Sequence, residues 1–239
     1  MRRARAFILV AVLVIVSTGC TTEGNDPTTT TSISSTTSTT VAQTTTSSTS
    51  TTTTAPTSTT VASNDPWSID YPLDAETVDD LPAVLADKID APEPDPDLTI
   101  EGPDDIDRWV NEWLDWFSWV SANPEEGVVA LEHAVIPAST FYADTLAALE
   151  ADRDAGTALL GYAFKPVEVS GTFDEFFERR ELLRVVVVAA DEIPGYVIDR
   201  AGAVISVIEP LDGEATIRLL LRYRQEDEEW VLENLEVLG

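Results

Sequence analysis

Hydrophobic residues in the second half of the chain recur first at helical spacing. From Asp104 to Ser121 they fall on one side of a helix when residues are placed about 100° apart. Asp104, Asp105 and Asp107 open the segment, where the helix dipole favours negative charge. The pattern predicts an amphipathic helix with a wide apolar face. That face would consist of Ile106, Trp109, Val110, Trp113, Leu114, Trp116, Phe117 and Val120.

Two further helices are predicted after this one. Asn123 is suited to an N-cap and Pro124 to the first helical position, so a helix should run from there to about His133. Another helix is predicted over residues 139–155, and Gly156 provides its C-terminal stop.

From Leu160 onward the hydrophobic pattern changes to a period of two, which is typical of β-strands. Turn-forming sequences occur at residues 210–213 and 225–229. A sheet with one apolar face needs a helical cover on that face. Because the helices precede the strands, the predicted fold class is α+β, with three N-terminal helices packed on a curved, mainly antiparallel sheet. The candidate strands are residues 163–173, 180–190, 196–208, 215–224 and 230–238.

The last two predicted strands carry a resemblance to a known superfamily. Residues 219–224 read Leu-Leu-Leu-Arg-Tyr-Arg, and a charged turn then leads to Trp230 and the alternating residues up to Leu235. This ending resembles that of the nuclear-transport-factor-2-like, or cystatin-like cone, superfamily, and the resemblance extends over about residues 104–239. It implies a sheet wrapped around the first helix, with a conical cavity at one end. In that superfamily the cavity is catalytic in some proteins, binds a small molecule in others and is filled in others.

The N-terminus has the pattern of a secretory signal. Residues 1–5 are basic, and the apolar run over residues 6–16 is shorter than the roughly 20 residues that a membrane-spanning helix needs. The next residues, Ser17-Thr18-Gly19-Cys20, resemble the lipobox of bacterial lipoproteins, although Ser17 stands where Leu is usual. The resemblance implies that residues 1–19 are removed and that Cys20 is acylated, for instance with palmitate. A plain cleaved signal peptide with an incidental cysteine is the alternative.

Two connectors of different composition follow the signal. Residues 20–63 are mostly Ser and Thr and cannot bury enough apolar surface to fold, so they form a disordered tether, with or without O-linked sugars. Residues 64–103 are acidic and Pro-rich, which predicts an extended linker with a short helix within residues 79–88. A calcium site there is disfavoured, because no Gly stands where a calcium loop needs its sharp turn. The folded domain would then be residues 104–239.

Charge and cysteine content exclude several classes of function. The chain of 239 residues has 14 basic and 43 acidic side chains, a formal net charge of −29, which excludes a general nucleic-acid binder. A single Cys excludes an internal disulfide and a thiolate-rich metal site. We therefore expect no metal and no cofactor.

Few residues are candidates for chemistry. His133 and Asp199 are weak candidates for a catalytic base, and both also fit structural roles. No phosphate-binding loop, serine nucleophile motif or histidine-rich metal pattern occurs in the sequence. The candidates for lining a pocket are aromatic, and a packed core without a pocket is the alternative for them. They are Trp109, Trp113, Trp116, Tyr142, Tyr162 and Tyr223.

Arginines concentrate in the predicted strands. Alternation places Arg180 and Arg184 on one strand face and Arg218, Arg222 and Arg224 on another. If the two faces coincide, they form a basic patch that could receive an acidic partner or a second copy of the chain. Neutralisation by neighbouring acidic residues is the alternative, with Glu181, Glu233 and Glu236 as the partners.

Three interpretations follow. The leading one is a bacterial surface protein, held on the outer side of the cell membrane by lipid on Cys20, that displays a non-catalytic domain for a small apolar ligand or an envelope protein. The second is an isomerase-like or hydrolase-like enzyme that uses the cavity. The third is a structural or assembly partner that forms a homodimer through the arginine-bearing sheet face.

Overall fold

The computed structural model describes residues 66–190, 194–209 and 214–238. The predicted signal peptide, Cys20, the Ser/Thr-rich tether and the turn at residues 210–213 lie outside these ranges. Helices are followed by antiparallel strands, which confirms the predicted α+β class.

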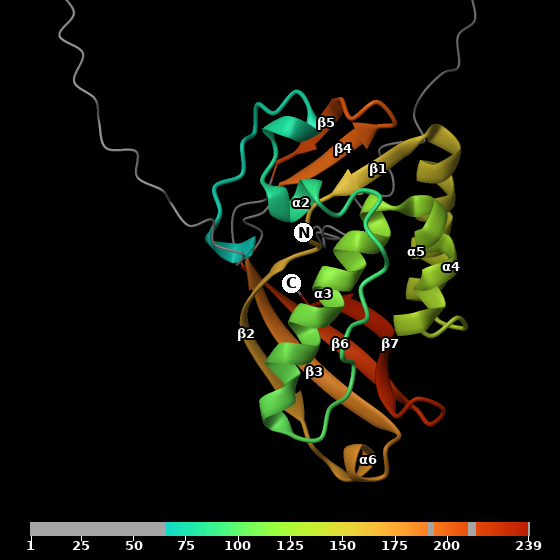
Figure 1. The fold of residues 1–239 in the computed structure, drawn as a ribbon. Helices are drawn as coiled ribbons and strands as arrows, with labels where there is room; N and C mark the ends of the chain where they lie inside the picture. Colours follow the sequence, from blue (N-terminus) through green and yellow to red (C-terminus); the bar gives the residue numbers. More distant parts are fainter. Residues whose placement is uncertain (1–65, 191–193, 210–213, 239) are drawn as a thin grey trace, which may run out of the picture. The chain divides into compact units, whose positions relative to one another are not determined.

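Three helices form the first half of the domain: α3 (Ile106–Ala122), α4 (Pro124–Ala134) and α5 (Thr140–Ala155). The start of α5 is capped by Ser139, whose hydroxyl accepts a hydrogen bond from the backbone N–H of Tyr142 at 3.0 Å. The helix ends at Gly156, which has a left-handed backbone conformation with φ of 68° that suits glycine. Figure 1 shows α3 lying across the long strands, with α4 and α5 to its side.

The strands form two antiparallel sheets. The first has the order β2–β3–β6–β7, from β2 (Lys165–Thr172), β3 (Leu182–Ala190), β6 (Glu214–Arg224) and β7 (Glu229–Val237). The second has the order β1–β4–β5, from β1 (Thr157–Leu160), β4 (Gly195–Asp199) and β5 (Val204–Ile208). A short helix, α6 (Glu175–Glu178), connects β2 to β3, and Asp174 caps it.

The strand predicted over residues 196–208 is a hairpin. A carboxylate oxygen of Asp199 accepts hydrogen bonds from the backbone N–H groups of Ala201 and Ala203, at 2.8 and 3.0 Å, and Gly202 has a positive φ of 82°. These contacts close a tight turn between β4 and β5. The hairpin pairs with β1, a segment for which the hydrophobic pattern predicts no strand, so the strands do not follow one another as a single meander. As a result, β3 pairs directly with β6, although β4 and β5 lie between them in the sequence.

The prediction of an extended linker over residues 64–103 is wrong for the part that the structure describes. Residues 66–105, here called the strap, pack on the domain and contain a few short turns of helix: η2 (Pro66–Ser68), η3 (Val78–Asp80), α2 (Ala83–Ala86) and η4 (Pro103–Asp105). Backbone hydrogen bonds join the strap to β7 and to β5, from Trp230 N–H to the Leu98 carbonyl and from Val204 N–H to the Glu76 carbonyl. Widely spaced apolar residues between the prolines and carboxylates enter the core: Leu81, Leu85, Leu98 and Ile100.

Arg108 on α3 holds the last part of the strap. Its guanidinium donates to the backbone carbonyls of Asp97 and Thr99, each at 2.6 Å, and pairs with the Asp97 carboxylate at 2.7 Å. Asp105 accepts hydrogen bonds from the backbone N–H groups of Glu101 and Gly102, which lower its pKa. These contacts satisfy backbone groups that an extended linker would leave to water.

We expect replacement of Leu85 by Ala to destabilise the domain by about 2–5 kcal/mol, because this side chain of the strap is fully buried in the core. Replacement of Leu73 by Ala is the matched control: this strap residue is 52% exposed, so its loss should change stability by less than about 0.5 kcal/mol. Urea unfolding followed by far-UV circular dichroism measures both. Equal effects of the two substitutions would show that the strap does not pack on the core.

Candidate functional site

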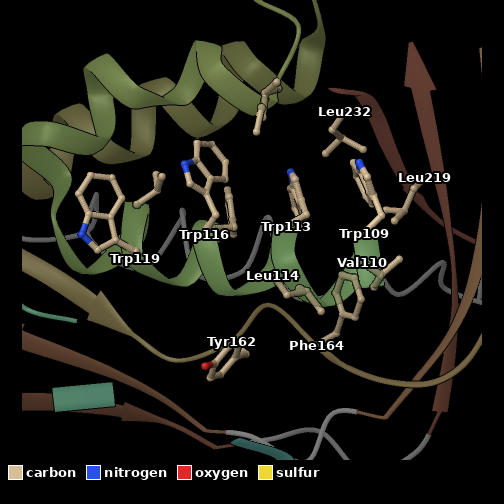
Figure 2. Close-up of a cluster of buried hydrophobic side chains, with 14 of the residues drawn as sticks. Trp109, Val110, Trp113, Leu114, Trp116, Trp119, Tyr162, Phe164, Leu219 and Leu232 are labelled. Carbon is tan, nitrogen blue, oxygen red and sulfur yellow. The ribbon is translucent and has the colours of Figure 1, made fainter. Parts of the chain in front are cut away.

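The tryptophan face of α3 was the first candidate for a pocket lining. Trp109, Trp113 and Trp116 are each 0% exposed. The rings of Trp109 and Trp113 are nearly parallel, 6.2 Å apart, and Trp113 stacks on Phe117 at 4.9 Å. Figure 2 shows the indole rings in a row along one side of the helix, each packed among other side chains. The stripe therefore forms part of the core.

The indole N–H groups differ in what they contact. Trp109 Nε1 donates to the carbonyl of Trp230 in β7 at 2.8 Å, which ties the helix to the sheet. Trp116 donates to a carboxylate oxygen of Glu93 at 3.2 Å, and Trp119 to the carbonyl of Ala91 at 2.9 Å. Within the described ranges, Trp113 Nε1 is a buried donor with no hydrogen-bond partner.

Trp119 lies on the polar flank of α3 in the sequence pattern, yet only 3% of it is exposed. The strap explains this, because Ala91 and its neighbours cover the ring. The hydrophobic pattern of α3 alone cannot predict that Trp119 is buried, because the residues that cover its ring lie about 28 positions earlier in the chain.

The candidate tyrosines lie in three different environments. The Tyr162 hydroxyl donates to Asp115 at 3.1 Å, and burial together with the nearby carboxylate raises the pKa of this tyrosine well above its usual range. Figure 2 shows Tyr162 on the opposite side of α3 from the indoles. Tyr223 accepts a hydrogen bond from Arg180 and packs its ring on Trp230, whereas Tyr142 is half-buried on α5.

The two weak candidates for a catalytic base also have structural partners. His133 lies near the end of α4 with a side chain that is 58% exposed, and its Nδ1 is 2.8 Å from a carboxylate oxygen of Glu93. That same oxygen accepts the hydrogen bond from Trp116. Asp199 caps the β4–β5 turn described above. In the described part of the chain no hydrogen bond or ion pair joins these two residues.

A hollow of about 510 Å³ lies at the start of the strap. Trp67 forms one part of its wall and stacks, tilted, on Tyr162 with 4.9 Å between ring centroids. Tyr71, which also lines the hollow, donates its hydroxyl to the carbonyl of Pro66 at 2.8 Å. The wall thus combines aromatic and aliphatic surface with one carboxylate. We call this pocket the strap hollow. Its lining residues are Trp67, Ser68, Ile69, Asp70, Tyr71, Leu73 and Pro194.

None of the candidate pocket residues from the sequence lines the strap hollow directly, although Tyr162 supports it through Trp67. The acidic, Pro-rich composition of residues 64–103 predicts a linker there and therefore no pocket. The one available signal was an aromatic cluster, Trp67 and Tyr71, in an otherwise polar and Pro-rich stretch.

The described residues contain neither a metal-binding cluster nor a membrane-spanning helix. No group of three or more His, Cys, Asp or Glu side chains in those ranges is placed to hold a metal ion. Within the same ranges, none of the helices combines the length and the hydrophobicity needed to cross a bilayer.

Comparison with known proteins gives similarity to solved structures alone. No protein-family model and no curated protein matches the chain. Among solved structures, the intermembrane space region of the chloroplast protein ARC6 is similar over 54% of this chain and 91% of its own length, with 12% sequence identity and a TM-score of 0.37. Similarity at this level establishes neither a shared fold nor a shared function.

The unequal indole contacts lead to a prediction about stability. Replacing Trp109 by Phe removes the hydrogen bond to the Trp230 carbonyl, whereas replacing Trp113 by Phe removes a donor that has no partner. Both substitutions make the same change in volume at fully buried positions. We expect Trp109→Phe to cost about 1–3 kcal/mol more in the free energy of unfolding than Trp113→Phe. Urea unfolding of the two variants measures the difference, and a larger cost at Trp113 would contradict the assignment of contacts.

Proposed function

We propose that the chain is a lipid-anchored protein of the bacterial cell surface, and that its folded domain binds a ligand or partner without catalysing a reaction. The observation that carries this proposal is the fully buried tryptophan stripe of α3, which is packed as core. The candidate bases give further support, because Asp199 closes a turn and His133 pairs with Glu93. Recognition is then a property of the domain surface.

The anchor is argued from the sequence. The only cysteine of the chain stands directly after a basic segment, a short apolar run and the small residues Ser17 to Gly19. Acyl chains contribute about 0.8 kcal/mol for each buried methylene, so two or more chains hold a protein stably on a membrane. The Ser/Thr-rich segment over residues 21–63 would then connect the acylated cysteine to the folded domain.

We also infer that residues 104–239 belong to the nuclear-transport-factor-2-like superfamily. In support, α3 contacts both β1 and β2, and these strands lie in different sheets although only residues 161–164 separate them in the chain. The long helix therefore faces both sheets at once, as a helix inside a curved sheet does.

The strap hollow is the place on the described surface where we propose that a small ligand binds. A hollow that combines aromatic side chains with polar groups can hold a small molecule. Trp67 and Leu73 offer apolar surface, and the Asp70 carboxylate offers hydrogen-bond acceptors. This chemistry suits an uncharged ligand with an apolar face and hydroxyl or amino donors.

Labelling with an alkyne analogue of palmitate tests the anchor. We expect the natural chain, expressed in a bacterium that processes lipoproteins, to carry the label and to remain with the membrane fraction. The variant Cys20→Ser keeps the size and polarity of the residue but cannot form the thioether, so it should carry no label. Label on Cys20→Ser, or none on the natural chain, contradicts the proposal.

A charged side chain at the rim tests the strap hollow. We expect Leu73→Arg to reduce the affinity for any small molecule found by a thermal-shift screen at least about tenfold, because it fills the hollow with a solvated cation. Val129→Arg is the matched control, since Val129 is 68% exposed on α4 and lies outside the hollow. Affinities come from isothermal titration calorimetry. Turnover of the bound molecule would instead support the enzyme alternative.

A further inference from the structure

The strap hollow is built on the polar face of α3. Trp67 Nε1 donates to the side-chain oxygen of Asn111 at 3.3 Å, and the Tyr162 hydroxyl donates to Asp115 at 3.1 Å. Asn111 and Asp115 are one helical turn apart, so they are neighbours on the helix surface. The Asn111 amide nitrogen donates to the Asp107 carbonyl at 2.7 Å, which fixes the side-chain oxygen as the acceptor for Trp67. The core helix therefore holds both rings of the stacked pair Trp67–Tyr162.

Tyr162 forms a firm support behind Trp67. Its residue is 8% exposed, and the Lys88 ammonium lies 5.4 Å from the centroid of its ring. Lys88 also pairs with Asp115 at 2.7 Å, so the cation, the carboxylate and the tyrosine contact one another. Trp67 itself is half-buried and lines the hollow. It is thus an aromatic platform that is held in place before a ligand binds, which reduces the entropy lost on binding.

The loop that carries the rest of the hollow is held at both ends. The Tyr71 hydroxyl donates to the Pro66 carbonyl at 2.8 Å, and the Tyr196 hydroxyl of β4 donates to the Pro72 carbonyl at 2.9 Å. Asp70 lies between these two points in the chain and is exposed. Its carboxylate is therefore carried by an ordered loop and remains accessible to a ligand.

The charge of the hollow is negative. Asp70 is the one charged side chain among the described residues that line it. The arginines that the sequence pattern grouped into a basic patch are engaged elsewhere. Arg180, which has a positive φ of 53°, donates to Tyr223, and Arg224 donates to the carbonyl of His133 at 2.8 Å. Because the net charge of the chain is −29, an anionic ligand is repelled from this site.

A carboxylate beside an aromatic ring suits a sugar better than other small ligands. The C–H bonds on one face of a pyranose ring are polarised by the attached oxygens and pack on the negative face of an indole. Adjacent sugar hydroxyls donate together to the two oxygens of one carboxylate, and such charge-assisted bonds are about twice as strong as neutral ones. A flat aromatic ligand without hydroxyls lacks this pair of donors. A cation gains little from Asp70, because water screens an exposed carboxylate.

We propose that the strap hollow binds a neutral pyranose sugar, with Trp67 as the stacking platform and Asp70 as the acceptor for two of its hydroxyl groups. This inference rests on the proposed function of the hollow as a small-ligand site and narrows the ligand to one chemical class. The volume of about 510 Å³ falls within the roughly 300–1,000 Å³ that is usual for small-molecule sites. The sugar is either free in solution or one residue of a glycan, since both present the same ring.

Isothermal titration calorimetry with methyl α-glucoside, methyl α-mannoside and methyl β-galactoside tests the proposal on the full chain with Cys20→Ser, which has no acylation site. We expect at least one glycoside to bind with a dissociation constant of about 1 mM or tighter. Asp70→Asn should weaken binding about fivefold or more, because it replaces a charged acceptor by a neutral one. Asp87→Asn is the matched control, since Asp87 is an exposed strap residue outside the hollow, and it should leave the constant unchanged.

Trp67→Leu tests the stacking platform. It keeps an apolar side chain but removes the aromatic face, so the affinity for the glycoside should fall at least about tenfold. Circular dichroism melting shows whether each variant remains folded, and Asp70→Asn changes only an exposed side chain. Glycoside binding that no folded variant of Trp67 or Asp70 weakens would overturn the proposal. So would the absence of glycoside binding at about 10 mM.

Two further probes separate this inference from the proposed function: choline, a cation, and caffeine, a flat neutral aromatic ring without hydroxyls. If either binds in a way that Leu73→Arg prevents while no glycoside binds, the hollow remains a ligand site and the sugar inference is overturned. A trisaccharide of the bound sugar then identifies the source. Tighter binding than that of the glycoside supports a residue of a glycan, and weaker binding supports a free sugar.

Discussion

The structure depends on covering the aromatic surface of α3. A buried indole removes roughly 150–250 Å² from water, and α3 carries four tryptophans that are almost entirely buried. At about 25 cal/mol per Å², burial of this surface contributes on the order of 15–25 kcal/mol as an upper bound. The sheet covers one part through Trp230 and Leu232, and the strap covers another through Ala91 and Glu93. The sheet and the strap thus both pack against α3.

The same packing makes the aromatic face of α3 part of the interior. The rings of Trp109, Trp113 and Phe117 stack on one another and are buried, so this face of α3 is packed as core. The polar side chains that could have taken part are used to hold elements together: Asp199 closes a hairpin and Tyr162 donates to Asp115 on α3. Only Trp113 Nε1 is left as a buried donor without a partner in the described residues.

The few basic residues of this acidic chain connect separate elements of the fold. Arg108 fixes the strap to α3, and Arg224 joins the end of α4 to the turn before β7 through Asp227 and Glu229. The arginines on the outer sheet face are neutralised by neighbours on adjacent strands or loops, which agrees with the local pairing considered for Glu233 and Glu236. What remains on that face is balanced charge around half-buried valine and leucine. The strap hollow is a separate feature at the N-terminal end of the strap.

The sequence by itself determined the features that depend on local physics. The helical period predicted α3, Ser139 and Gly156 marked the ends of α5, and the period of two predicted β3, β6 and β7 to within about two residues. Only the tertiary structure decided what depends on contacts between distant residues. It showed that β4 and β5 leave the first sheet to pair with β1, that the acidic strap packs on the core, and that Trp119 is covered. The apolar residues of the strap follow neither a helical nor a strand period, because each packs against other elements of the fold. Their burial can be recognised only when the positions of those elements are known.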